Sequence, residues 1–323
     1  MIDIKLLEQL CLCNGISGDE GNVRNLIINE IKDCADDIKT DNLGNLIVFK
    51  KGKKSAKSKL MVSAHMDEVG LMVTDITSDG YLKFDEVGGI DRRVLPGKRV
   101  CVGRNGLNGV IGVKPIHLTN GDEKTAVPKM NDMYIDIGAE SREDALKYVN
   151  YGDGINFEGD FKINGKTVVT KALDDRFGCY VLINLIKSEP EYDMYFTFVV
   201  QEEVGLRGAR PVAFTVNPDF ALVIESTTAA DVAEVDASHQ VCNLSKGATV
   251  TVMDRATVYD KEMISAAFEL AEKNNIAVQY KRAVAGGNDS GAIHQSRGGV
   301  RTLAVSLPSR YIHAPSTAAN LDD

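Results

Sequence analysis

The sequence lacks the patterns that mark membrane-spanning, exported and disulfide-stapled proteins. No apolar run approaches the roughly 18 residues that a bilayer-spanning helix needs. The first residues show no basic stretch followed by an apolar one, so they do not resemble a signal peptide. The six cysteines form no CxxC pair and are spread over a chain that is long enough to build a core without staples. We therefore expect a cytoplasmic protein with reduced thiols that is not exported and does not bind membranes.

Basic charge is also scarce. Lys and Arg number 37 against 46 Asp and Glu, which gives a net charge of −9. A general nucleic-acid binder normally carries a basic face, so this balance argues against one and leaves open only a local basic patch. The chain has no internal repeat and no low-complexity tract. With 44% hydrophobic and 26% charged residues it has the composition of an ordinary globular protein.

Two kinds of sequence pattern occur along the chain. Residues 2–10 and 20–32 space their apolar side chains as amphipathic helices do, and strand-like and helix-like segments alternate again from residue 167 onward. Between about 69 and 162, short β-like runs are separated by many Asn-Gly and Asp-Gly turn signals, and only 141–149 looks helical. Short β-like runs separated by frequent turns are typical of an all-β module.

The lengths of these segments predict a discontinuous arrangement. At 323 residues the chain has room for one large domain or two, since domains usually hold about 100–200 residues. We predict an α/β domain with a mainly parallel or mixed central sheet, formed by residues 1–68 and 164–323. A β-rich domain at 69–163 interrupts it.

The strand predicted at 195–200 is β-branched, aromatic and apolar on both faces, which is typical of a buried central strand. Glu202 and Glu203 follow at its carboxyl end, where ligands bind in open α/β sheets. A solvated acidic loop is the alternative interpretation of an isolated Glu-Glu pair. Adjacent side chains on a strand point to opposite faces, so we expect the two carboxylates to have different tasks.

Other predicted elements also end in polar residues. His65 ends a strand, and Asp67 follows two residues later, where its carboxylate would fix the tautomer of the imidazole. Asp174 lies between a strand and a helix, a position that equally suits a simple helix cap. Two further strands end in the same way, at Glu225 after 220–224 and at His313 after 302–307.

Together these positions supply two histidines and four carboxylates: His65, Asp174, Glu202, Glu203, Glu225 and His313. Imidazole combined with carboxylate suits zinc, cobalt or manganese, and a bridging carboxylate can hold two ions about 3.5–4 Å apart. The set contains no thiolate, which argues against a structural zinc site. A catalytic site also needs an unliganded carboxylate that takes a proton from the attacking water, and Glu202 and Glu203 are able to divide these tasks.

A glycine-rich loop follows at 285–291. We assign Gly286, Gly287, Asn288 and Asp289 to substrate binding, although the glycine pair would serve a tight turn equally well. His117 and His239 are interpreted as structural residues, and His239 has no partner motif. His294 is also interpreted as a structural residue, but it follows the glycine pair closely enough that lining the substrate cleft is an alternative.

Six short motifs occur in order along the chain, each weak alone: Ala64-His-Met-Asp-Glu-Val-Gly, Ala172-Leu-Asp-Asp-Arg-Phe-Gly, Gln201-Glu-Glu-Val-Gly, Val223-Ile-Glu-Ser-Thr, Gly286-Gly-Asn-Asp-Ser and Arg310-Tyr-Ile-His. Taken together, they give the sequence a resemblance to the glutamyl aminopeptidase and tetrahedral (TET) aminopeptidase family of dinuclear metallopeptidases. The resemblance covers nearly the whole chain.

The resemblance implies a role for each candidate residue. One metal ion would bind His65, Asp174 and Glu225, and the other Asp174, Glu203 and His313. Glu202 would be the general base, and Asp67 would orient His65. The β-rich domain would be a PDZ-like β-barrel that mediates dimerisation within a homo-oligomer, either a dimer or a dodecamer.

The leading hypothesis is therefore a metal-dependent aminopeptidase that removes N-terminal residues from peptides with two divalent ions, zinc or cobalt before manganese. A preference for acidic N-terminal residues is implied by the resemblance alone. A deacylase or glycan-processing enzyme on the same scaffold is the first alternative, because a dinuclear site attacks many amides and esters. A non-catalytic assembly protein with a vestigial site is the second, and the complete set of six groups argues against it.

Overall fold

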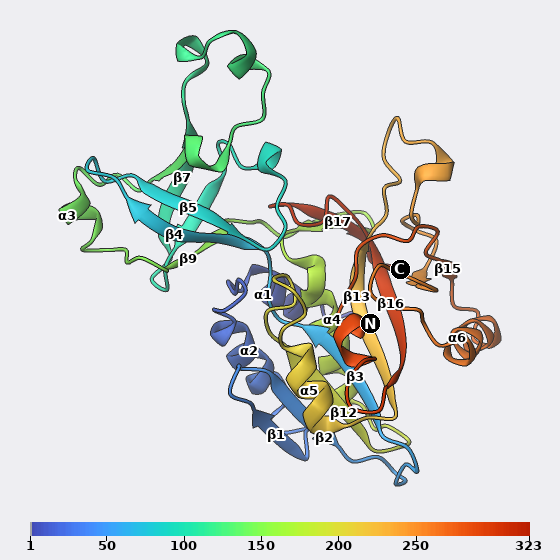
Figure 1. The fold of residues 1–323 in the computed structure, drawn as a ribbon. Coiled ribbons are helices and arrows are strands. Elements are labelled where there is room, and N and C mark those ends of the chain that lie inside the picture. The colour runs from blue at the N-terminus through green and yellow to red at the C-terminus, as the bar shows by residue number, and fades with distance from the viewer. Residues whose placement is uncertain (1) are drawn as a thin grey trace.

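The computed structural model describes residues 2–323 and contains a large mixed sheet, helices on both faces of it, and a separate β-barrel (Figure 1). The sheet consists of β1 Asp37–Thr40, β2 Leu46–Lys50, β3 Leu60–His65, β10 Lys162–Asn164, β11 Thr167–Thr170, β12 Met194–Val199, β13 Phe220–Thr228, β14 Ala248–Val250, β15 Val278–Tyr280, β16 Arg301–Arg310 and β17 Thr317–Asn320. The strand order is β1-β2-β12-β3-β13-β16-β17-β11-β10, and β14 pairs with both β16 and β15.

Four neighbouring strands of this sheet run parallel. β3 pairs in parallel with β12 on one side and with β13 on the other, and β13 pairs in parallel with β16. The carboxyl ends of the four strands therefore meet at one edge, where α/β proteins bind their ligands. β12 is an interior strand with Phe196 and Phe198 fully buried, as its apolar sequence predicts.

Helices cover both faces because β3 and its neighbours are apolar on both faces. The side chain of Val62 packs in one core cluster with α1 and α4, and that of Met61 packs in another with α5 and α7. The helices are α1 Ile4–Leu12, α2 Gly21–Ile31, α4 Leu173–Lys187, α5 Ala209–Val216, α6 Lys261–Lys273 and α7 Ser290–Ile293. Within residues 2–323, none of the helices is long and apolar enough to cross a membrane.

The inserted module is a closed antiparallel barrel with strand order β4-β5-β8-β7-β6-β9. Its strands are β4 Gly70–Ile76, β5 Leu82–Val87, β6 Arg99–Val102, β7 Leu107–Val113, β8 Met133–Asp136 and β9 Gly154–Phe157. Closure removes the exposed edges of a sheet, and the barrel encloses a core of its own that includes Leu71, Ile111 and Ile135. The predicted β-rich insertion in an α/β protein is thus confirmed, while the boundaries at 69 and 163 stay a prediction.

The short helices are α3 Arg142–Ala145, η1 Arg92–Val94, η2 Ile116–Leu118, η3 Gly121–Lys124, η4 Met130–Asp132 and η5 Ala237–His239. The helix predicted at 141–149 is only one turn long. Ser141 caps it as expected, because its side chain accepts a hydrogen bond from the Asp144 N–H. The N–H groups of Lys147 and Tyr148 then bond three residues back, so the chain tightens into turns after α3.

One strand is longer than the sequence predicts. The pattern places β13 at 220–224, but the strand continues to Thr228, because it pairs with β16 over its whole length, from Phe220 opposite Arg301 to Thr228 opposite Ser309. Glu225 therefore lies inside the strand rather than beyond its end.

Candidate metal centre

Five elements bring the predicted ligands to one edge of the sheet. His65 is the last residue of β3, and Glu225 lies in the neighbouring β13. Asp174 lies in the first turn of α4, where the backbone departs from helical geometry. Glu203 follows β12, and His313 follows β16. The convergence follows from the parallel strands, which all end on this side.

The first group of ligands surrounds the ring of His65. Its Nε2 lies 3.3 Å from Asp174 Oδ1 and 3.3 Å from Glu225 Oε1. Its Nδ1 lies 3.0 Å from the carbonyl oxygen of Asp67. A proton on Nδ1 is donated to that carbonyl, and the lone pair of Nε2 then faces the two carboxylates, which is the orientation of a metal-ligating histidine.

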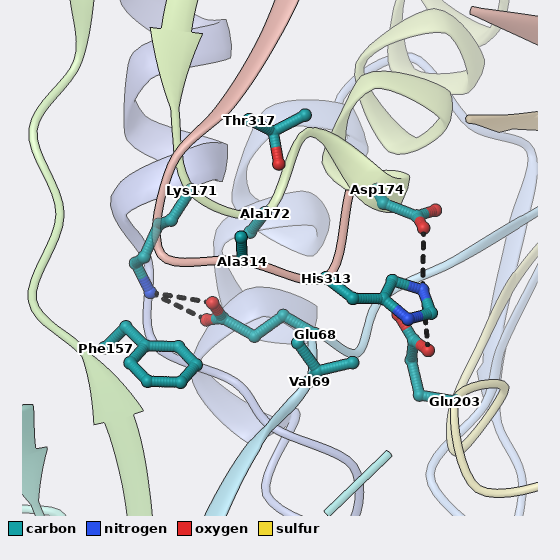
Figure 2. A pocket seen from close by; sticks show the side chains of 10 residues that line it. All are labelled: Glu68, Val69, Phe157, Lys171, Ala172, Asp174, Glu203, His313, Ala314 and Thr317. Atoms are coloured by element: carbon teal, nitrogen blue, oxygen red, sulfur yellow. Dashed lines mark hydrogen bonds and ion pairs between the residues drawn. The ribbon is translucent and has the colours of Figure 1, made fainter. Parts of the chain in front are cut away.

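The second group surrounds the ring of His313 (Figure 2). Its Nε2 lies 3.3 Å from Asp174 Oδ2 and 3.2 Å from Glu203 Oε2. Its Nδ1 lies 2.9 Å from the carbonyl oxygen of Gly89, which follows β5 of the barrel. Asp174 thus faces one histidine with each of its two oxygens. A carboxylate in this position is able to bridge two ions.

The alternative interpretation of Asp174 as a helix cap does not fit the structure. The side chain that accepts a hydrogen bond from the first turn of α4 is that of Asp175, whose Oδ1 lies 3.0 Å from the Gly178 N–H. The Asp174 carboxylate points instead toward His65 and His313.

Glu202 and Glu203 lie in a turn after β12 and not in an extended segment, so the alternation of side chains along a strand does not apply to them, and their different tasks stay a prediction. β12 ends at Val199, and Gln201 has a left-handed backbone with φ of 57°. The N–H groups of Glu202 and Glu203 then donate to the two oxygens of Asp67 at 3.0 and 3.1 Å. In this turn both glutamates face the cavity, and His65, Glu202 and Glu203 place ligand atoms within 4.8 Å of one another.

Asp67 faces the ring of His65 with both its side chain and its backbone. Its carboxylate lies 3.5 Å from His65 Nδ1, whereas its backbone carbonyl lies at 3.0 Å. The carboxylate accepts shorter hydrogen bonds from the Ser17 hydroxyl at 2.6 Å and from the two N–H groups of the glutamate turn. The Asp67 carboxylate thus contacts both His65 and the glutamate turn, and its role in orienting His65 stays a prediction.

The crowding of buried carboxylates shifts their protonation. Burial, with the nearby charge of Asp174, raises the pKa of Glu203 to about 8. Burial likewise raises the pKa of Glu225 to about 8. Burial lowers the pKa of His313, but Asp174 and Glu203 outweigh that effect and bring the pKa to about 9. The site gathers more carboxylates than its imidazoles can neutralise, so cations would stabilise the ionised forms.

The residues fit two divalent cations. The donors are imidazole nitrogens and carboxylate oxygens, which suit zinc, cobalt or manganese. Glu225 also keeps a buried oxygen, Oε2, that has no hydrogen-bond partner among the described residues. An orphaned buried acceptor is unusual, because such atoms normally find a partner, and a cation would supply one.

A cavity of about 220 Å³ opens beside both ligand groups. Gly286, Gly287 and Asn288 line it, and their role in substrate binding stays a prediction. Asp289 does not line it: this carboxylate is fully buried behind the loop. Lys281 lies in the cavity wall and was missed, because a lysine just beyond a short strand carries no pattern that distinguishes it from a surface residue.

The other histidines lie outside the ligand groups found among residues 2–323. His117 is exposed in η2 of the barrel, and His239 is exposed in η5. The ring of His294 bonds to the carbonyl of Ser290 one turn earlier. Their interpretation as structural residues stays a prediction.

Sequence comparison decides the family. The sequence profile of the family described as M42 glutamyl aminopeptidase matches residues 44–323. This chain belongs to that family. Members of the M42 family are dinuclear metallo-aminopeptidases, so the protein is a hydrolase.

Two relatives differ in the residue for which they are named. The lysyl aminopeptidase of Pyrococcus furiosus is 33% identical over 100% of this chain and 94% of its own length. The glutamyl aminopeptidase of Lactococcus lactis subsp. cremoris is 32% identical over 95% of this chain and 88% of its own. Residue specificity therefore varies among M42 relatives of similar distance.

Solved structures of relatives share the whole fold. The TET aminopeptidase of a Thaumarchaeota archaeon is 33% identical and superposes with a TM-score of 0.94 over 99% of this chain and 92% of that one. The TET1 peptidase of Pyrococcus horikoshii, which can assemble into a tetrahedron or a large octahedral shell, is 40% identical with a TM-score of 0.88 over 99% and 95%. The predicted family and fold class are confirmed.

Proposed function

We propose that this M42 enzyme removes the N-terminal residue of peptides with two divalent metal ions held at the sheet edge. The observation that carries the proposal is the position of Asp174, whose two oxygens each face the Nε2 atom of a different histidine at 3.3 Å. His65 and Glu225 complete one ligand group, and Glu203 and His313 complete the other. Zinc and cobalt are the proposed metals, with manganese as a further candidate.

When bound, the two ions supply Lewis-acid chemistry, which polarises the scissile carbonyl and lowers the pKa of the attacking water. The chain supplies the orientation of the ligands. The carbonyls of Asp67 and Gly89 fix the rings of His65 and His313, so that each Nε2 faces the carboxylates.

Glu202 is the proposed general base. It lines the cavity beside His65 and Glu203 but belongs to neither group that contains Asp174. Burial raises the pKa of its carboxyl well above the usual range, which strengthens it as a proton acceptor. In the reaction Glu202 takes the proton of the attacking water and passes it to the nitrogen of the leaving amine.

Lys281 supports the proposed preference for acidic N-terminal residues. Its Nζ donates to the carbonyl of Ala285 at 2.9 Å, and it is the lysine of a cavity wall that also holds His65, His313 and several carboxylates. An ammonium has three donors, so Lys281 keeps capacity for a substrate carboxylate. Its burial lowers its pKa, and pairing with such a carboxylate would offset that cost.

The barrel is proposed to mediate dimerisation, with residues 69–163 as its domain. Its wall and its projecting segment between β7 and β8 carry exposed apolar side chains, among them Val110, Ile116 and Leu118. Exposed apolar groups of this kind are found where subunits meet. We propose a homo-oligomer, either a dimer or a TET-like dodecamer, located in the cytoplasm.

The substrate assignment is tested with anilides of Glu, Leu and Lys and with N-acetylated Glu anilide, on metal-loaded enzyme. We expect cleavage of free Glu anilide ahead of the others and none of the N-acetylated substrate. Charged hydrogen bonds contribute about 1.5–3 kcal/mol, so Lys281→Met should lower kcat/KM for Glu anilide roughly 10–100-fold and spare Leu anilide. Release of acetate from the N-acetylated substrate, with no hydrolysis of the free anilides, would instead identify a deacylase.

A further inference from the structure

Three consecutive N–H groups in the turn that carries Glu202 and Glu203 are bound by two buried carboxylates. Asp67 accepts from Glu202 and Glu203 at 3.0 and 3.1 Å. Glu20 accepts from Gln201 at 3.1 Å. Glu20 belongs to neither ligand group and does not line the cavity, so nothing in the proposed chemistry accounts for it.

Glu20 also does not serve its own helix. It stands at the N-terminus of α2, yet its side chain makes no capping hydrogen bond there. Its Oε1 instead accepts from the Gly18 N–H at 2.7 Å and from the Gln201 N–H, while the residue is only 4% exposed. A buried carboxylate is unfavourable unless it is hydrogen-bonded, so both contacts stabilise its burial, and the one with Gln201 joins it to a distant segment.

The turn needs such support because of the conformation of Gln201. Its φ of 57° lies in the left-handed region, which a residue with a side chain rarely adopts unless its surroundings hold it there. Were the chain extended at this point, Glu202 and Glu203 would point to opposite sides. The left-handed residue turns both carboxylates toward the cavity.

We propose that Glu20 is a positioning residue, which acts through the Gln201 N–H to keep the Glu202–Glu203 turn in its reactive geometry. The inference rests on the proposed roles of those two glutamates. One oxygen of Glu20 receives both hydrogen bonds, so an amide oxygen at the same place serves equally well. The positioning role therefore depends on the length of the Glu20 side chain and on its acceptor oxygen, and not on its negative charge.

Two variants separate these properties. Glu20→Gln keeps the side-chain length and the acceptor oxygen, whereas Glu20→Asp keeps the charge but is shorter by one methylene. A displacement of about 1 Å in a catalytic group can cost about 10²-fold in rate. We expect Glu20→Asp to lower kcat for Glu anilide by about that factor with little change in KM, and Glu20→Gln to keep nearly the wild-type kcat.

Amide hydrogen exchange tests the hydrogen bond between Glu20 and the Gln201 N–H without requiring peptidase activity. Glu20→Asp should speed exchange in the peptide that contains residues 200–204 and leave α6 unchanged, and Glu20→Gln should do neither. Glu30→Ala is the matched control, because Glu30 lies on the same helix in a partly exposed pair with Lys187. It should change neither kcat nor exchange at 200–204.

Two results would overturn the inference. If Glu20→Asp has wild-type kcat and wild-type exchange at 200–204, the hydrogen bond between Glu20 and the Gln201 N–H does not position the turn. A loss of kcat in Glu20→Gln, with wild-type kcat in Glu20→Asp, would assign the effect to charge. A wild-type enzyme without peptidase activity would contradict the proposed function and not the role of Glu20. Hydrogen exchange at 200–204 does not depend on the reaction, so it would still test that role.

Discussion

Glu202 and Glu203 are neighbours in the chain whose surroundings differ. Glu203 Oε2 lies 3.2 Å from His313 Nε2 and shares a ligand group with Asp174. Glu202 joins only the group that contains His65 and Glu203. The contacts of Glu203 are those of a ligand, and the place of Glu202 at the edge of the ligand groups suits a base that handles protons.

We predict different losses for the two amide substitutions. Glu202→Gln removes a proton acceptor, so kcat should fall about 10²–10⁴-fold while both metal ions stay bound. Glu203→Gln replaces a charged ligand by a weaker one, so one metal ion per chain should be lost more readily. Elemental analysis and steady-state kinetics on both variants check this. Metal loss from Glu202→Gln, with full metal and low turnover in Glu203→Gln, would mean that the roles are swapped.

The residues of the centre differ in how far the sequence could predict them. His65 is the last residue of an apolar strand, and Glu203 follows shortly after another, so the pattern places both at the sheet edge. Glu20 and Lys281 could not be found in this way. Their roles depend on contacts with Gln201 and with the cavity, and both contacts join segments far apart in the sequence.

Among the elements, those with strong local signals were predicted best. The amphipathic segments at 2–10 and 20–32 correspond to α1 and α2, with bounds that differ by one or two residues. The turn after β12 was missed, because the left-handed Gln201 is held by Glu20, a residue at the start of α2. The extension of β13 was missed for a similar reason: it depends on pairing with β16, which outweighs local propensity.

The first turn of α6 offers a test of local stability. Asp260 caps the helix by accepting from the Met263 N–H at 3.0 Å, and it also pairs with Arg301. Asp260→Ala should lower the free energy of unfolding by about 1 kcal/mol, mostly through the lost cap, since exposed ion pairs contribute little. Denaturant unfolding checks this, with Glu269→Ala as an exposed control on the same helix.

The same contacts predict the pH dependence of that effect. Hydrogen bonds from Arg301 lower the pKa of Asp260 to about 2 in the folded protein, below the value of about 3.9 in an unfolded chain. The contribution of Asp260 to stability is therefore fully present above about pH 4 and is lost as the pH falls toward 2. The difference between wild type and Asp260→Ala should shrink over this window, and a difference that grows there would contradict the assignment.

At the scale of the whole molecule, the barrel takes part in the metal centre. The Gly89 carbonyl orients His313, although Gly89 belongs to the insertion and His313 to the α/β part. The neighbouring Gly88 has a φ of +84°, and a Cβ there would lie 2.8 Å from Val69 Cγ1 and 3.2 Å from Glu203 Cβ. Glycine thus allows the barrel to approach the ligands closely.

Gly88→Ala should therefore weaken metal binding at the Glu203 and His313 group. Gly97→Ala is a matched control, because Gly97 has a similar φ of +77° but a Cβ added there would meet no atom within 4 Å. Both changes should destabilise the fold by about 1–2 kcal/mol through the strained backbone, and only Gly88→Ala should lower metal occupancy, measured by elemental analysis. Equal metal occupancy in the two variants would show that the close approach of the barrel at Gly88 does not affect metal binding.

The central claim, a dinuclear centre in which Asp174 serves both ions, is tested most directly by metal titration. Chelator-treated enzyme receives zinc or cobalt in steps, and hydrolysis of Glu anilide is measured after each addition. We predict that activity is abolished by the chelator and returns to its maximum only at two ions per chain, because five ligands exceed the needs of one tetrahedral ion. Full activity at one ion per chain, or activity that survives complete metal removal, would contradict the account.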